Sequence, residues 1–201
     1  METAIVGLVG VLLGAILATA KDWWLQRLQL QKAAAYLCVR TSAALERFAE
    51  RCADVAVDDG LCEGQTDEYG CHQIQIAPPT FDPDGLEVEW RSLPVALMYE
   101  VLDFPSKVSA GSHQVLAAFE SSGPPDYWEG FEARQETYAK LGLDAYALSA
   151  KLRSHASLPA FDASLKDWDP VAFLRGRLSV IAEQRTRREE QIALGNQRDD
   201  L

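Results

Sequence analysis

The sequence predicts a mostly α-helical protein, in which an N-terminal transmembrane helix continues into an antiparallel helical bundle with a small β-hairpin insertion. Three observations lead to this prediction. Residues 3–20 carry no charge, and residues 21–57 contain neither proline nor glycine. Later segments repeat apolar residues at the three-and-four spacing of a buried helix face, and proline and glycine clusters separate these segments.

The uncharged segment has the length of a membrane span. An α-helix rises 1.5 Å per residue, so a hydrocarbon core of about 30 Å needs roughly 17–25 apolar residues. Residues 3–20 meet this requirement, and Trp23 and Trp24 follow closely. Indole rings favour the membrane interface because they combine an apolar body with one polar N–H group. We therefore predict a transmembrane anchor over residues 1–24, with Trp23 and Trp24 at the interface.

The basic residues beside this segment predict its orientation. Only Glu2 precedes the apolar run, and four basic residues follow it: Lys21, Arg27, Lys32 and Arg40. Basic flanks stay in the cytoplasm, so we expect a single-pass protein of the inner (cytoplasmic) membrane with a cytoplasmic C-terminal domain. The alternative is an exported protein whose signal peptide is cleaved after residue 20, because residues 18–20 match the small-x-small cleavage pattern.

Small residues line one face of the predicted span. Gly10 and Gly14 form a GxxxG pair, Ala18 continues it, and Gly7 lies one turn earlier. Small side chains let two helix backbones approach closely in lipid. The sequence therefore predicts helix packing at this face, either in a homo-oligomer or with a protein partner.

Length and charge limit what the rest of the chain can be. The protein has 201 residues and a net charge of −11, so the part after the anchor is long enough for one domain with its own core. Residues 53–130 hold fifteen acidic side chains against two basic ones. This balance excludes nucleic acid as a partner, since phosphate binding needs clustered lysine and arginine. It indicates a solvated acidic face or, alternatively, a docking surface for a basic partner.

The helical bundle is expected over residues 25–195. A first helix ends near residue 57 and is followed by an irregular acidic insertion, residues 58–91, that contains most of the glycine and proline breaks. Within it, the alternating runs 72–76 and 86–90 predict a β-hairpin. Residues 196–201 are expected to form a disordered tail.

Three more helices are expected. The second begins at Ser92 as N-cap and is kinked or interrupted at Pro105. The third covers residues 127–156 and starts with a capping box at Asp126. The fourth is capped by Asp169, and its packed part ends near residue 181. Three tryptophans near helix starts are expected to close the end of the bundle: Trp90, Trp128 and Trp168.

No motif for catalysis is present. The chain has no glycine-rich phosphate loop, no nucleophile elbow and no metalloprotease helix motif, so we expect no enzyme activity and no cofactor. The weak candidates for metal ligands are Cys62, Cys71 and His72, whose spacing departs from that of zinc knuckles. Cys38 and Cys52 lie in the first helix, where a thiol packs as a small apolar group.

The uncharged N-terminal span, the paired tryptophans, the continuous helix and the proline-punctuated helical domain together resemble small bacterial membrane proteins with one N-terminal anchor and a cytoplasmic helical domain. The resemblance covers the whole layout and implies neither an activity nor site residues. We expect a membrane-anchored, non-enzymatic interaction or scaffold protein. The alternative is a sensor that responds to metal or redox state through the loop with Cys62, Cys71 and His72.

Overall fold

The computed structural model describes residues 2–161 and 168–199, and the side chains of residues 17, 19–161 and 168–195. Four α-helices and two short 3₁₀ helices are found in this part of the chain: α1 (Glu2–Val55), η1 (Asp84–Leu86), η2 (Trp90–Ser92), α2 (Val95–Ser121), α3 (Trp128–His155) and α4 (Pro170–Asp199). The prediction of a mostly α-helical bundle is confirmed.

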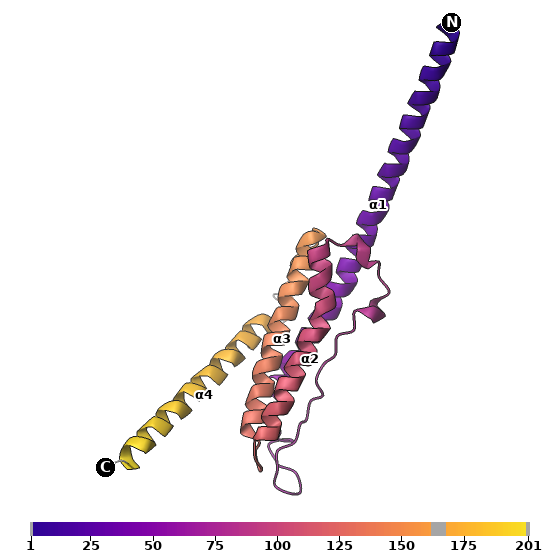
Figure 1. Ribbon diagram of the computed structural model, residues 1–201. Helices are drawn as coiled ribbons and strands as arrows, with labels where there is room; N and C mark the ends of the chain where they lie inside the picture. The colour runs from indigo at the N-terminus through magenta and orange to yellow at the C-terminus, as the bar shows by residue number, and fades with distance from the viewer. Residues whose placement is uncertain (1, 162–167, 200–201) are drawn as a thin grey trace.

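The helices pack around α3 (Figure 1). α1 and α2 run in one direction and α3 runs back against both of them, while α4 starts beside α3 and runs at an angle to it, so that its C-terminal end points away from the bundle. α1 and α2 run the same way because the long segment 56–94 carries the chain back along the bundle before α2 begins. This crossover brings the acidic insertion against the ends of α2 and α3.

The core consists mainly of small and branched side chains of α1 facing aromatic and aliphatic side chains of α3. Leu45, Ala49 and Cys52 are completely buried, as are Ala145 and Leu152 on α3. Gly142 lies where a Cβ atom would meet Leu174, Cys52 and the Ala49 carbonyl. The absence of a side chain at Gly142 therefore lets α1, α3 and α4 approach one another closely.

The N-terminal half of α1 projects from the bundle (Figure 1). Its side chains are exposed from residue 19 to residue 32, and burial begins at Ala33. Among the described residues, no helix is long and apolar enough to cross a membrane. Most of the predicted span, residues 3–20, lies outside the described side chains, and so does the predicted packing face of Gly7, Gly10, Gly14 and Ala18.

The predicted β-hairpin is wrong. Residues 72–76 and 86–90 form no strands, and the second run instead connects the end of η1 to the start of η2. The backbone N–H groups of Gln75 and Ile76 donate to the Asp58 carboxylate, and the Gln73 N–H donates to the Gly60 carbonyl. The hydrogen bonds of the first run are thus made with the end of α1, which removes the need for a second strand.

Several helix boundaries differ from the prediction. α2 begins at Val95, since Ser92 belongs to η2, and it continues through Pro105 without interruption. Asp126 does not cap α3, because Tyr127 occupies the N-cap position in the left-handed conformation (φ 48°). The cap at α4 is confirmed: the Asp169 carboxylate accepts the N–H groups of Val171 and Ala172 at 2.9 and 3.1 Å. The helical backbone of α4 extends to Asp199, into the region expected to be a disordered tail.

Candidate functional site

The crossover loop is anchored by a buried ion pair between Asp58, just beyond the end of α1, and Arg134 on α3. Arg134 donates to the Asp58 carboxylate at 2.8 Å, and the side chains of Arg134 and Asp58 are only 2% and 1% exposed. Arg134 also donates to the Ile76 carbonyl oxygen. The other Asp58 oxygen accepts the Gly60 N–H at 3.0 Å. Both Asp58 carboxylate oxygens and both Arg134 Nη atoms therefore have hydrogen-bond partners, as a buried charge pair requires.

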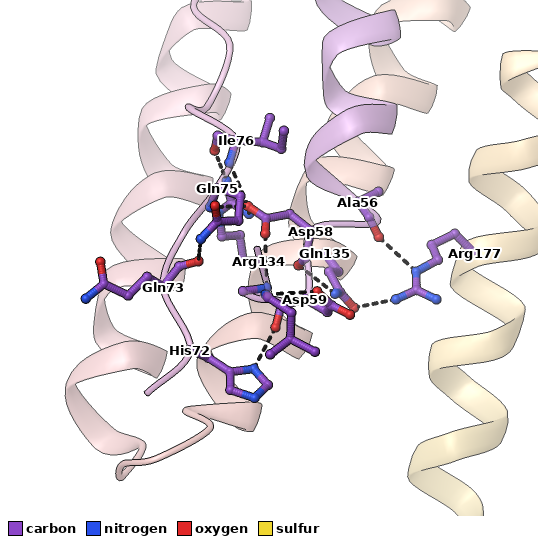
Figure 2. A network of polar contacts seen from close by, with 12 residues as sticks. Ala56, Asp58, Asp59, His72, Gln73, Gln75, Ile76, Arg134, Gln135 and Arg177 are labelled. Atoms are coloured by element: carbon purple, nitrogen blue, oxygen red, sulfur yellow. Dashed lines mark hydrogen bonds and ion pairs between the residues drawn. The ribbon is translucent and has the colours of Figure 1, made fainter. Parts of the chain in front are cut away.

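A second set of contacts extends this network to α4 (Figure 2). The Gln135 amide donates to the Asp58 carbonyl at 2.8 Å and accepts a hydrogen bond from Arg177 at 2.8 Å. Arg177 also donates to the Ala56 carbonyl just beyond the end of α1, at 2.8 Å. This carbonyl would otherwise lack an intrahelical partner. The network therefore joins α1, the crossover loop, α3 and α4.

Sequence reasoning missed this network, although one signal for it was present. Arg134 lies three residues after Phe131 and four before Tyr138, so it lies on the apolar helix stripe to which both of these residues belong. A charged residue on such a stripe requires a buried partner of opposite charge. The partner could not be identified from spacing, because Asp58 lies 76 residues away in the chain.

A further polar cluster lies near the other end of the α1–α3 interface. Arg153 donates from Nε and Nη2 to the two Glu46 oxygens at 2.7 and 3.0 Å, and Ser149 donates to Glu46 at 2.6 Å. Glu46 accordingly raises the pKa of Arg153 above its ordinary value, mainly through these hydrogen bonds. The cluster satisfies a nearly buried carboxylate and holds two helices in register.

Ion pairs also hold α4 on α3. Arg185 donates to Glu132 and Glu136, Arg188 pairs with Glu132, and the Arg188 guanidinium lies 4.4 Å from the centre of the Trp128 ring. The contact between the two helices thus extends one to two turns beyond residue 181, where the packed part was expected to end. Lys140 and Arg185 lower the pKa of Glu136 below its ordinary value.

The three tryptophans do not close the bundle as apolar plugs. Trp128 is 43% exposed and Trp168 is 39% exposed, while Trp90 is half-buried against the core. Trp128 lies under Arg188, and Trp168 contacts Phe173 with ring centres 5.5 Å apart. Only Trp90 therefore packs on the core, whereas the rings of Trp128 and Trp168 cover surface near the starts of α3 and α4.

The candidate metal ligands lie on the crossover loop at the end of the bundle opposite the projecting half of α1. Cys62 is exposed, and its backbone pairs with that of Gln65 in a tight turn. Cys71 is half-buried, and its N–H donates to Asp67. The Nδ1 atom of His72 lies 2.8 Å from the Asp59 carbonyl oxygen. Across the described residues, no group of three or more potential ligands could hold a metal ion.

An aromatic hollow of about 620 Å³ lies beside this loop. Its lining includes Tyr69 and His72 from the loop, Phe119 from the end of α2, and Tyr127 and Phe131 from the start of α3. The Phe119 and Phe131 rings meet edge to face with centres 5.1 Å apart. The Asp67 carboxylate also lines the hollow, so an aromatic surface and a negative charge lie side by side.

Comparison with protein-family models, with curated proteins and with solved structures gives no match.

Proposed function

We propose that the protein is a membrane-anchored, non-enzymatic helical interaction protein of the inner membrane, with its bundle in the cytoplasm. The observation that carries the proposal is the continuity of α1, a helix of 54 residues that begins with the uncharged run and ends inside the bundle core. At 1.5 Å per residue such a helix is about 80 Å long. It is long enough to span a bilayer and still supply the first helix of a soluble bundle.

The surface just after the uncharged run supports this placement. Trp23 and Trp24 are 59% and 62% exposed, and Leu25, Leu28 and Leu30 are exposed as well. Large apolar side chains exposed within such a short segment are suited to membrane or partner contacts. The Arg27 guanidinium lies 5.4 Å from the centre of the Trp23 ring, an arrangement suited to the interface between lipid and water.

The polar groups of the bundle support a structural role rather than catalysis. Asp58 and Arg134 are paired with each other and bonded to the backbone, and Glu46 is bound by Arg153 and Ser149. A catalytic base or nucleophile must be within hydrogen-bond reach of a substrate, whereas these side chains are already bonded inside the protein. The exposed features of the bundle are instead a charged last helix and an acidic, aromatic end, and both suit binding to another protein.

Thiol labelling tests the topology, because the four cysteines differ in exposure. Cys62 is exposed and Cys71 is half-buried on the crossover loop, whereas Cys38 and Cys52 are completely buried in the bundle. With a membrane-impermeant maleimide, we expect no adduct in intact cells, two adducts in permeabilised cells and four after denaturation, read by intact mass. The protein should also stay in the membrane pellet after alkaline extraction.

A Glu2→Cys variant supplies the matched control, since this position is expected on the outer side. It should gain one adduct in intact cells. Two adducts on the natural chain in intact cells would overturn the cytoplasmic placement, and a mature protein that begins at Lys21 would establish the exported alternative. Extraction of the uncleaved protein at alkaline pH would overturn the anchor.

A further inference from the structure

The aromatic hollow lies at the end of the bundle opposite the projecting half of α1, where the crossover loop meets the turn between α2 and α3. Phe131 is buried and forms its floor, and Phe119 and His72 contact the Phe131 ring edge to face at 5.1 and 6.0 Å between centres. Tyr69 is 80% exposed. A large aromatic side chain so exposed on an ordered loop is surface available to a partner.

The loop that carries Tyr69 is held in place by Asp67. One Asp67 oxygen accepts the N–H groups of Tyr69 and Cys71 at 2.9 and 2.8 Å, and the other accepts the Gln73 amide at 2.6 Å. The hydrogen bond from the Cys71 N–H contributes most to lowering the pKa of Asp67. The His72 N–H donates to the Pro125 carbonyl at 2.9 Å, which ties the loop to the turn between α2 and α3.

The surroundings of the hollow are strongly negative. A smaller hollow of about 230 Å³ shares His72 and Phe131 with it and is lined by further carboxylates. Its one basic lining residue, Arg188, is paired with Glu132. Among the ion pairs between described residues, none neutralises Asp59, Asp67 or Asp126. The surface therefore combines aromatic faces with unneutralised carboxylates.

Aromatic faces beside carboxylates favour the binding of a cationic group. A guanidinium or ammonium group is attracted to an aromatic face, and a nearby carboxylate adds a charge-assisted hydrogen bond. Arginine fits better than lysine because its planar group stacks on a ring while its N–H donors reach a carboxylate. An anionic lipid or a nucleic acid would be repelled by the same surface.

We propose that this end of the bundle is a docking site for an arginine-bearing segment of a partner protein, whose guanidinium group enters the hollow between Tyr69, Tyr127 and Asp67. The inference rests on the proposed function in taking the ligand to be a protein. It agrees with the negative charge of residues 53–130, which carry thirteen more acidic than basic side chains.

The test uses the full-length protein in uncharged maltoside micelles and an acetylated, amidated peptide with three arginines separated by glycines. Titration calorimetry at low salt should show saturable binding that weakens as salt is added, and NMR should show shifts at Tyr69 and His72. Tyr69→Ala should weaken binding about 2- to 5-fold, the equivalent of an exposed cation–π contact. Tyr99→Ala removes a 66% exposed ring on α2, outside the hollow, and should leave affinity unchanged.

The same peptide with citrulline in place of arginine keeps the shape and loses the charge. Equal binding of this peptide, equal weakening by Tyr99→Ala, or no binding at all would overturn the proposal. A peptide that only dissociates a dimer of the protein would show that the natural occupant is a second copy, and would also overturn it. Because micelles replace the membrane, these outcomes are independent of the topology experiment.

Discussion

Arg134 on α3 donates to Asp58 just beyond the end of α1 across 2.8 Å, and both side chains are almost completely removed from solvent. The pair spans 76 residues of sequence. Because Asp58 also accepts backbone N–H groups of the crossover loop, this contact determines where the loop lies. It therefore also positions the aromatic hollow, although neither residue lines it.

Arg134→Leu should strongly destabilise the protein, since it leaves the Asp58 carboxylate buried without its partner. We expect a loss of about 3–5 kcal/mol in the free energy of unfolding, measured by urea denaturation. Arg187→Leu is the matched control, because Arg187 is 74% exposed and lies 3.7 Å from Glu183. It should change stability by less than about 0.5 kcal/mol. In a double-mutant cycle, Asp58→Asn should cost much less in the Arg134→Leu background, and additive effects would contradict a direct coupling.

Gly142→Ala should destabilise the bundle at the contact of α1, α3 and α4. The added Cβ would lie 2.9 Å from a Leu174 methyl group and 3.0 Å from the Cys52 Cβ, so the Leu174 side chain and the facing backbone of α1 must shift. Overpacking of this kind costs about 1–3 kcal/mol. Gly176→Ala on α4 is the control, because nothing lies within 4 Å of its added Cβ. It should stabilise the protein by about 0.5–1 kcal/mol. Thermal unfolding measures both variants, and the prediction would be wrong if both were stabilised or both were destabilised.

The contribution of Glu136 should depend on pH. Lys140 and Arg185 hold its pKa in the folded protein below the ordinary value of 4.5. A lowered folded pKa stabilises the fold above the unfolded pKa, and the contribution is lost as the pH falls through the folded value. Glu136→Gln should therefore cost about 0.5–1 kcal/mol at pH 7, and the difference from the natural protein should shrink below pH 4.5. Urea unfolding between pH 7 and pH 3 measures this difference in the free energy of unfolding. A difference that does not change with pH would show that Glu136 does not stabilise the fold through its ion pairs.

The four thiols should react in two classes. Burial raises the pKa of Cys38 and Cys52, so these thiols stay protonated and shielded at pH 8. Cys62 and Cys71 lie on the crossover loop at or near the surface. With a chromogenic disulfide reagent, we expect two thiols to react quickly in the native protein and the other two only at the rate of unfolding. Cys62→Ser should remove one fast equivalent, and four fast equivalents would contradict the burial of Cys38 and Cys52.

Periodicity in the sequence was sufficient to locate the helices. The third helix lies within one residue of its expected bounds, and Ile181, near which the packed part of the fourth was expected to end, is buried. Local chemistry was sufficient for the Asp169 cap, since capping involves only the next few residues. Periodicity failed at residues 72–76, whose backbone bonds to Asp58 and Gly60 while most of their side chains stay exposed, and at residues 86–90, where the alternation arises from packing of one side on the core rather than from strand pairing.

The sequence by itself determined the helical class, the breaks between helices and the uncharged N-terminal run, because these follow from the spacing of apolar residues and from proline and glycine. Only the tertiary structure decided that the crossover loop is tied to α1 and α3 through Asp58 and Arg134, and that Tyr69, Phe119 and Phe131 share one hollow. The physical reason is that such contacts join residues far apart in the chain. Packing and the need to satisfy buried charge determine which residues become partners, and local sequence patterns do not predict those pairs.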